Sequence, residues 1–302
     1  MITRLISTSF VIVFLFQVFA TAQTVIEDRV AFTTPDAPWL VTFGNKNLDI
    51  QDQQIKPDGK SGYFLLFNEK EGLTVSLFIE PAVKCKTSVE CRDFVWKTGN
   101  PKWGKVQDVV QSKIGDVGYF EFFRPTVQNQ PLQVFDMYAQ FVENGYWVDL
   151  HISKVQYKKE DHLLFENFVK SIRFVSKTGK PTTDSDKAIE AAQKAAEDWM
   201  LLWDSGKYAE SYNALSTFSK KAFDEKAWFA HWTTERKPFG KLKSRKILNI
   251  SLIKSLQGLP NHSGAVFKYL SSFENKEDVF ETFSLMLEKN GIWRVISYNT
   301  NE

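Results

Sequence analysis

The chain has 302 residues, and its 38 basic and 36 acidic side chains leave a formal net charge of +2. Charges this balanced offer no basic surface to nucleic acid, so we expect no nucleic-acid partner. The aromatic content of 15% argues against disorder, and the length exceeds the roughly 100–200 residues of a typical domain, so we expect two domains.

The first 22 residues predict a cleaved signal peptide. Arg4 supplies a positive start, an apolar run extends from Leu5 to Phe19, and Ala20-Thr21-Ala22 is a small-residue cleavage pattern. A membrane anchor is the alternative, but the run is shorter than the roughly 20 residues that a spanning helix needs. We therefore expect an exported protein, periplasmic or secreted, without a stable membrane anchor.

Residues 23–176 predict a first domain built on an antiparallel sheet. Asn144-Gly145 between two alternating runs is a strong hairpin signal, because both residues tolerate a positive φ. Alternation and helical spacing predict strands at 37–43, 62–67, 73–79, 106–112, 118–123, 132–142 and 146–153, and helices at 89–97 and 161–174.

The first domain also contains the two cysteines of the chain, Cys85 and Cys91. In an exported protein an even count favours a disulfide, and free thiols are the alternative. A metal site would need four ligands, and no histidine lies near these cysteines in the sequence. We predict a structural disulfide and expect neither a metal nor a cofactor.

Three segments of the first domain have a pattern that is similar to the PsbP-like fold. They are Tyr119-Phe120-Glu121, the strand segment at 146–150 and the helical segment at 165–174. The resemblance implies an antiparallel sheet flanked by helices, and an accessory or assembly role rather than catalysis. A fold alone fixes no function.

Residues 177–185 are rich in glycine, proline and small polar residues and predict a linker. Thr183 and Asp186 have the spacing of a capping box, so a helix should start there and stop before Gly206. The second domain then occupies residues 186–302. Its remaining predicted elements are helices at 208–215 and 224–235 and strands at 245–254, 264–273, 279–288 and 292–299.

Short aromatic and basic motifs recur through the second domain. They are Trp199, Trp203–Tyr208, Ser211-Tyr212, Trp228, Arg236–Gly240, Ser244-Arg245 and Gly291–Tyr298. With these motifs the domain resembles a bacterial domain-of-unknown-function family, the one numbered four thousand and nineteen. The resemblance implies the cone-shaped α+β fold of nuclear transport factor two, in which helices cover a curved antiparallel sheet. The family has no assigned catalytic residues, so it implies none here.

His231 is the candidate general base, because an unperturbed histidine titrates near neutral pH. Its acid partner would be Asp198 or Asp204, one helix away. The alternative, which we adopt, is a structural histidine on an aromatic helix face.

Four neighbours of His231 are candidate binding residues. Trp228 and Trp232 would line a ligand pocket, although such residues more often belong to a core. Arg236 and Arg245 would hold an anionic group, or would instead pair with carboxylates of the helices.

Three functions are compatible with these patterns. The preferred one is an exported, non-catalytic protein that binds a small molecule or an envelope protein, or takes part in envelope assembly. The second is a small-molecule binder that uses the pocket of the C-terminal cone. The third is an isomerase-like or dehydratase-like enzyme with His231 as its base, which would need a carboxylate and a pocket that excludes water.

Overall fold

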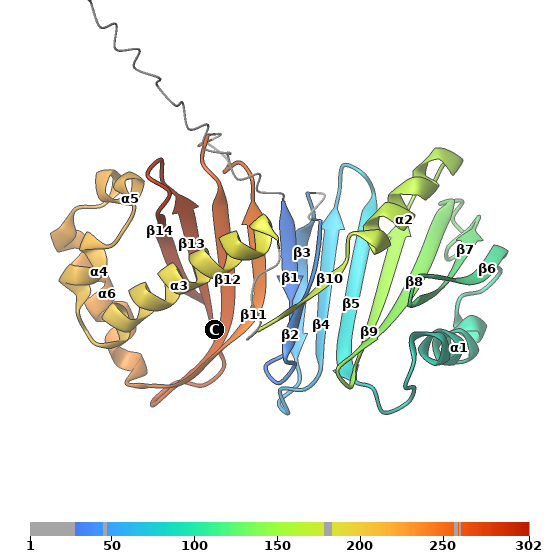
Figure 1. The fold of residues 1–302 in the computed structure, drawn as a ribbon, viewed down its shortest axis with the longest axis horizontal. Helices are drawn as coiled ribbons and strands as arrows, with labels where there is room; N and C mark the ends of the chain where they lie inside the picture. The colour runs from blue at the N-terminus through green and yellow to red at the C-terminus, as the bar shows by residue number, and fades with distance from the viewer. Residues whose placement is uncertain (1–27, 45–46, 178–182, 257–258, 260, 302) are drawn as a thin grey trace, which may run out of the picture.

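The structure is a computed structural model that describes residues 28–44, 47–177, 183–256, 259 and 261–301. Two seven-stranded antiparallel sheets lie side by side, each packed against helices (Figure 1). The predicted α+β class with helix-covered antiparallel sheets is therefore confirmed. The predicted signal peptide at 1–22 lies outside the described residues, as do residues 178–182 of the predicted linker.

The first sheet contains the hairpins that the sequence predicts, in the order β3-β4-β5-β9-β8-β7-β6. Asn144 and Gly145 turn β8 into β9 with φ angles of 48° and 79°. This turn pairs Glu143 with Tyr146 and fixes the register of both strands. The bounds are β3 (Asp49–Ile55), β4 (Gly62–Asn68), β5 (Leu73–Pro81), β6 (Gln107–Ile114), β7 (Val117–Arg124), β8 (Val134–Glu143) and β9 (Tyr146–Lys154).

Two helices lie on opposite faces of the first sheet. Trp96 of α1 (Ser88–Gly99) packs on Phe120 of β7, with ring centres 5.3 Å apart. Phe165 of α2 (His162–Lys170) packs on Phe135 of β8 at 4.9 Å. Because side chains alternate along a strand, the registers place Phe120 and Phe135 on different faces.

The helix predicted over 161–174 ends earlier, at Lys170. The backbone N–H of Ser171 still donates to Asn167, and its hydroxyl donates to the carbonyl of Phe168 (2.7 Å), which closes the last turn. From Arg173 to Ser176 the chain instead forms β10, which pairs with β2. The apolar Phe174 therefore packs from a strand, edge-on to Trp39 at 4.8 Å.

The second sheet has the order β10-β2-β1-β11-β12-β13-β14. Its strands are β1 (Arg29–Phe32), β2 (Trp39–Gly44), β10 (Arg173–Ser176), β11 (Leu242–Ile253), β12 (Gly264–Phe273), β13 (Val279–Leu287) and β14 (Trp293–Asn301). The helices are α3 (Asp184–Asp204), α4 (Tyr208–Asn213), α5 (Thr217–Ala222) and α6 (Glu225–Arg236), and the short 3-10 turns are η1 (Asn100–Lys102), η2 (Lys159–Asp161) and η3 (Lys237–Phe239).

Helix α3 begins as the sequence predicts and lies across β11 to β14 (Figure 1). The hydroxyl of Thr183 accepts from the backbone N–H of Asp186 at 3.1 Å, and the carboxylate of Asp186 accepts from the backbone N–H of Thr183 at 3.0 Å. These reciprocal bonds satisfy two donors at the helix start, so the predicted capping box is confirmed.

Strands from both ends of the chain share the second sheet. The N-terminal β1 pairs with β11 over four residues, from Arg29 with Leu252 to Phe32 with Asn249. Val30 and Phe32 belong to the core of the first sheet, whereas Ala31 faces the core under α3. Strand β2 is divided in the same way, with Leu40 in the core under α3 and Trp39 in the other core, so the two cores meet at β1 and β2. Pairing of β1 with β11 crosses the predicted boundary at 177–185.

A chain that is cut within residues 178–182 is therefore expected to remain a complex of two fragments. The β1–β11 ladder and the packing of β2 under α3 would hold the fragments after the connection is lost. An inserted protease site and size-exclusion chromatography test this: cut and uncut chains should elute together, and the cut chain should separate in urea. Separation without denaturant would contradict the prediction.

Candidate functional site

The buried face of helix α6 is not the face that contains His231. Trp228, Trp232 and Arg236, spaced by four residues, are buried, whereas His231 is exposed. The imidazole of His231 lies edge-on to Trp232, with ring centres 4.6 Å apart.

The two acids expected near His231 have other partners. Asp198 pairs with Lys194 on α3 at 3.1 Å. Asp204 pairs with Arg245 at 2.6 Å and with Arg236 at 3.1 Å. Within the part of the chain that the structure describes, neither carboxylate meets the imidazole.

Arg236 and Arg245 belong to a buried ion-pair network in the second half. Arg245 lies between two acids, since its Nε is 2.5 Å from Glu281 and its Nη1 is 2.6 Å from Asp204. Glu281 is fully buried and also accepts from the hydroxyl of Tyr298 at 2.7 Å and from that of Ser271.

Burial, together with the charge of Glu281 and the hydrogen bond to it, raises the pKa of Tyr298 well above its usual value. Arg236 stacks over Phe273, with its guanidinium carbon 4.3 Å from the ring centre. Both guanidinium groups are thus paired with carboxylates of this chain. This is the internal pairing that the sequence left open as the alternative to an anion site.

The first sheet carries a groove beside α1, which we call the α1 groove. It encloses about 790 Å³ on the face of the sheet that is opposite to α2. Helix α1, the segment 54–57 and strands β4, β5 and β9 form its walls. The side chains that line it include Tyr63, Phe78, Glu80, Lys84, Phe94, Trp147 and Asp149.

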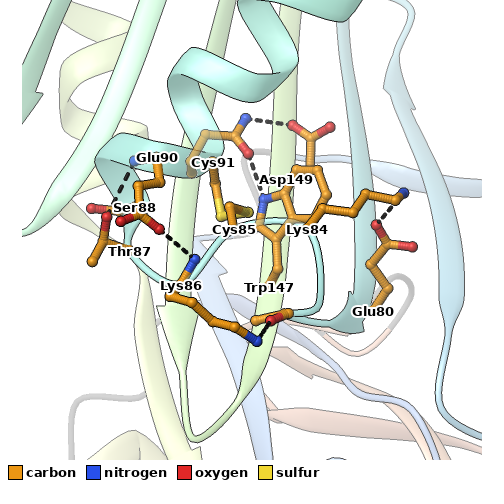
Figure 2. The surroundings of a disulfide bond; sticks show 12 residues. Glu80, Lys84, Cys85, Lys86, Thr87, Ser88, Glu90, Cys91, Trp147 and Asp149 are labelled. Atoms are coloured by element: carbon orange, nitrogen blue, oxygen red, sulfur yellow. Dashed lines mark hydrogen bonds and ion pairs between the residues drawn. A yellow bond between two sulfur atoms is a disulfide. The ribbon is translucent and has the colours of Figure 1, made fainter.

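A disulfide between Cys85 and Cys91 fixes α1 at the edge of this groove (Figure 2). Both cysteines are buried against Ala82 and Trp147. The hydroxyl of Thr87 caps the helix by accepting from the backbone N–H of Glu90 at 3.2 Å. The predicted disulfide is therefore confirmed, and it connects the segment between β5 and α1 to the first turn of α1.

Gly118 permits the close approach of α1 to β7. A Cβ atom at this position would lie 2.6 Å from the carbonyl oxygen of Ser88, in the first turn of the helix. Backbone atoms cannot move aside as a flexible side chain can, so a larger residue would push α1 away from the sheet.

Replacing both cysteines by serine is expected to lower the free energy of unfolding by about 2 kcal/mol, because the closed loop is short and restricts the unfolded chain only modestly. Urea unfolding of the variant and of the wild type measures this difference. Mass spectrometry of the non-reduced, denatured wild type should find no thiol that reacts with an alkylating reagent. Two reactive thiols would contradict the disulfide.

Asp149 lies on the floor of the groove and is held by a two-step relay of hydrogen bonds (Figure 2). The indole N–H of Trp147 donates to Oε1 of Gln140 at 2.6 Å. This bond turns the amide N–H of Gln140 toward Asp149, where it donates to Oδ1 at 2.6 Å. Among the described residues no cation pairs with Asp149.

The environment of Asp149 opposes its negative charge. Burial raises the pKa of this carboxyl to about 6, and the charge of Glu80 acts in the same direction. The hydrogen bond from Gln140 and the proximity of His151 lower the pKa but do not offset the burial. The groove therefore contains a carboxylate that would gain from a cationic neighbour.

Aromatic side chains form much of the remaining wall. Tyr63 and Phe78 face each other across β4 and β5 with ring centres 4.5 Å apart, and 48% of Phe78 is exposed. On the opposite side the ammonium of Lys84 lies over two rings, 5.7 Å from Trp147 and 5.8 Å from Phe94.

Replacing Asp149 by asparagine is expected to stabilise the protein at pH 7.5 by about 1–3 kcal/mol. Because the pKa of Asp149 is higher in the folded protein than in the unfolded chain, ionisation favours unfolding as the pH rises from about 4 to above 6. The gain should therefore shrink at pH 4.5, where the folded protein keeps the proton and the unfolded chain has lost most of it, and should vanish only below about pH 3, where both states keep the proton. Urea unfolding at the two pH values measures it.

Asp93→Asn is the matched control, since Asp93 is an exposed carboxylate of α1 outside the groove. Its effect should stay within about 0.5 kcal/mol at both pH values. A loss of stability in Asp149→Asn at pH 7.5 would contradict the prediction.

The sequence interpretation did not single out this groove, although one signal for it was present. The Asn144-Gly145 turn fixes Glu143 opposite Tyr146, and counting back along both strands sets Gln140 opposite Asp149. An acid and an amide at paired positions, each flanked by apolar residues, predict a side-chain hydrogen bond between the two strands. The position of α1 above them could not be read from local patterns.

The second half of the chain has a counterpart among known families. Residues 195–298 match a family model described as "Protein of unknown function (DUF4019)". The DUF4019 region covers the C-terminal part of α3 from residue 195, all of α4 to α6, and β11 to β13, and it ends within β14. It contains Arg236, Arg245 and His231 but no part of the α1 groove, so the resemblance stated from the sequence is confirmed and leaves the groove unassigned.

A solved structure is similar to part of the chain. It is the solution structure of cyanobacterial PsbP (CyanoP) from Synechocystis sp. PCC 6803, with 10% sequence identity and a TM-score of 0.34. The match covers 49% of this chain and 93% of that chain. No curated protein matches the chain.

A membrane-spanning helix and a cluster of metal ligands are both absent from the described residues. No helix in the described ranges has the length and apolar character to cross a membrane. Within the same ranges, no three or more His, Cys, Asp or Glu side chains are grouped so that they could hold a metal ion.

Proposed function

We propose that this is an exported, non-catalytic binding protein and that the α1 groove is its ligand site. The observation that carries the proposal is the carboxylate of Asp149, held without a cationic partner among the described residues in a groove of about 790 Å³. A polar group placed in an apolar concave site is typical of ligand recognition. Export is supported by the signal-like sequence at 1–22 and by the Cys85–Cys91 disulfide, since disulfides persist in oxidising compartments.

The arrangement of the second half favours this site over the two alternatives. Trp199, Trp203, Trp228, Trp232 and Tyr298 pack together between the helices and the sheet, where a cone-shaped pocket would open. His231 is exposed, and the acids that would serve it pair with lysine and arginine instead. A general base needs a positioned acid and a site that excludes water, so the geometry supports binding rather than catalysis.

Native mass spectrometry of the protein, purified without denaturation from cells that produce it, tests the proposal. We expect a bound small molecule on the wild type and its loss from Phe78→Ala, which removes one wall of the groove. Phe218→Ala is the matched control, because Phe218 and Phe78 are both 48% exposed and Phe218 lies on α5 in the other half.

Retention of the molecule by Phe78→Ala, or its loss from Phe218→Ala as well, would overturn the assignment to the groove. A wild type without any bound molecule, and without a melting-temperature shift in a fragment library, would overturn the binding function itself.

A further inference from the structure

We propose that the α1 groove takes an organic ammonium cation with an apolar chain, and that the ammonium of Lys84 fills part of this site in the free protein. This inference rests on the proposed function and adds the chemical class of the ligand. It is carried by three features of the groove: the carboxylate of Asp149, which has no cationic partner among the described residues, a wall of aromatic rings, and the ammonium of Lys84, which already lies over two rings and pairs with the other acid, Glu80.

The carboxylate gives the site its charge. Oδ1 of Asp149 accepts from Gln140, and Oδ2 has no hydrogen bond or ion pair with any other described residue. The relay from Trp147 through Gln140 fixes the direction of this carboxylate, because Gln140 cannot rotate without losing both bonds of 2.6 Å. A second acid, Glu80, lines the same groove. An incoming ammonium group would therefore meet preorganised acceptors.

The aromatic wall supports a cation in the same place. The negative faces of aromatic rings attract a cation within about 6 Å of the ring centre. Tyr63 and Phe78 leave an apolar surface open beside Asp149, since nearly half of Phe78 is accessible. An apolar chain attached to the ammonium would cover this surface and remove it from water.

Lys84 already displays this mode of recognition within the protein. Its ammonium pairs with Glu80 at 3.1 Å (Figure 2). It also lies over the rings of Trp147 and Phe94, while the side chain of Lys84 stays 53% exposed. An exposed lysine that is held so weakly can be displaced. Lys84 thus acts as an internal competitor for an ammonium ligand.

The test compares three probes of equal chain length and different charge: hexylammonium, hexanol and hexanoate. Each is titrated into the full mature protein while the indole N–H signal of Trp147 is followed by NMR, because this N–H reports on Gln140 and hence on Asp149. We expect hexylammonium to bind at least about tenfold more tightly than hexanol, as a charge-assisted hydrogen bond contributes more than about 1.4 kcal/mol.

Two pairs of variants test whether Asp149 causes the preference for hexylammonium and whether Lys84 competes with it. Asp149→Asn should remove this preference for hexylammonium, whereas Asp93→Asn should keep it. Lys84→Met should tighten hexylammonium binding severalfold, whereas Lys97→Met, with the same change of charge at an exposed position of α1 outside the groove, should leave the affinity near the wild-type value.

The outcomes separate this inference from the proposed function. If hexanoate or hexanol binds at the Trp147 signal as tightly as hexylammonium, the ligand class is wrong while the groove remains a binding site. If Lys84→Met behaves like Lys97→Met, the role of Lys84 as competitor is wrong. If no probe moves the Trp147 signal, both the ligand class and the groove assignment fail.

Discussion

Replacing Arg245 by leucine is expected to lower the free energy of unfolding by about 3–5 kcal/mol, since removal of one partner leaves buried charges uncompensated. Arg245 lies 2.5 Å from Glu281, which has no exposed surface, and 2.6 Å from Asp204. Without the guanidinium, the partners that remain for Glu281 among the described residues are the hydroxyls of Tyr298 and Ser271. Urea unfolding followed by tryptophan fluorescence measures the loss.

Two further variants decide whether the buried charges cause this loss. Arg294→Leu removes a more exposed arginine whose Nε lies 3.7 Å from Glu288, and it should lower stability by no more than about 1 kcal/mol. Adding Glu281→Gln to Arg245→Leu should restore part of the stability, because the amide is neutral and can still bond to Tyr298. No recovery in the double variant would contradict the electrostatic explanation.

Replacing Phe32 by alanine is expected to destabilise both halves of the protein, by about 3–5 kcal/mol overall. Phe32 is fully buried in the first core, where its ring centre lies 4.8 Å from Phe64 and 5.7 Å from Phe43. Its backbone pairs with Asn249 of β11 in the second half. Loosening β1 should therefore release the second sheet as well as the first.

Hydrogen exchange measured by mass spectrometry shows whether both halves lose stability or only the half that contains Phe32. In Phe32→Ala we expect faster exchange in β4 and β5 and also in β11. The exposed Phe218→Ala should change none of these strands. If exchange in β11 stays at the wild-type rate, the two halves unfold independently and the shared sheet does not couple them.

Local sequence patterns predicted the elements whose interacting residues lie close together in the sequence. The Asn144-Gly145 hairpin, the Thr183–Asp186 capping box and the Cys85–Cys91 disulfide each involve residues a few positions apart. Their geometry depends on turn and cap chemistry that the residues carry with them, so the sequence was sufficient.

Short elements that depend on distant partners were missed. Strands β1 and β10 have four residues each, too few for an alternation to stand out, and each exists because of the strands beside it. Strand β3 is polar and half exposed, so it has no apolar stripe to detect. Helix α5 has six residues and no apolar repeat, and it is set by the cap at Ser216.

The candidate site was also predicted only in part, because local spacing was visible and long-range packing was not. The spacing of Trp228, Trp232 and Arg236 was visible, yet His231 was predicted to share the face of Trp228 and Trp232, whereas it is exposed. Positions three and four residues apart both lie near one helical face, and only packing decides which of them turns inward. The α1 groove needs helix α1, strands β4, β5 and β9 and the segment 54–57 to meet, which no single pattern encodes.

The sheet that joins the two halves has a consequence for the order in which the chain becomes structured. Arg29, near the start of the described chain, pairs with Leu252, near its end. A chain that emerges N-terminus first presents β1 and β2 long before β11 and α3 exist. Ala31 and Leu40, which finally face α3, stay uncovered during that interval. Strand β1 is thus synthesised early but completed late, and a chaperone that shields an apolar strand would act there.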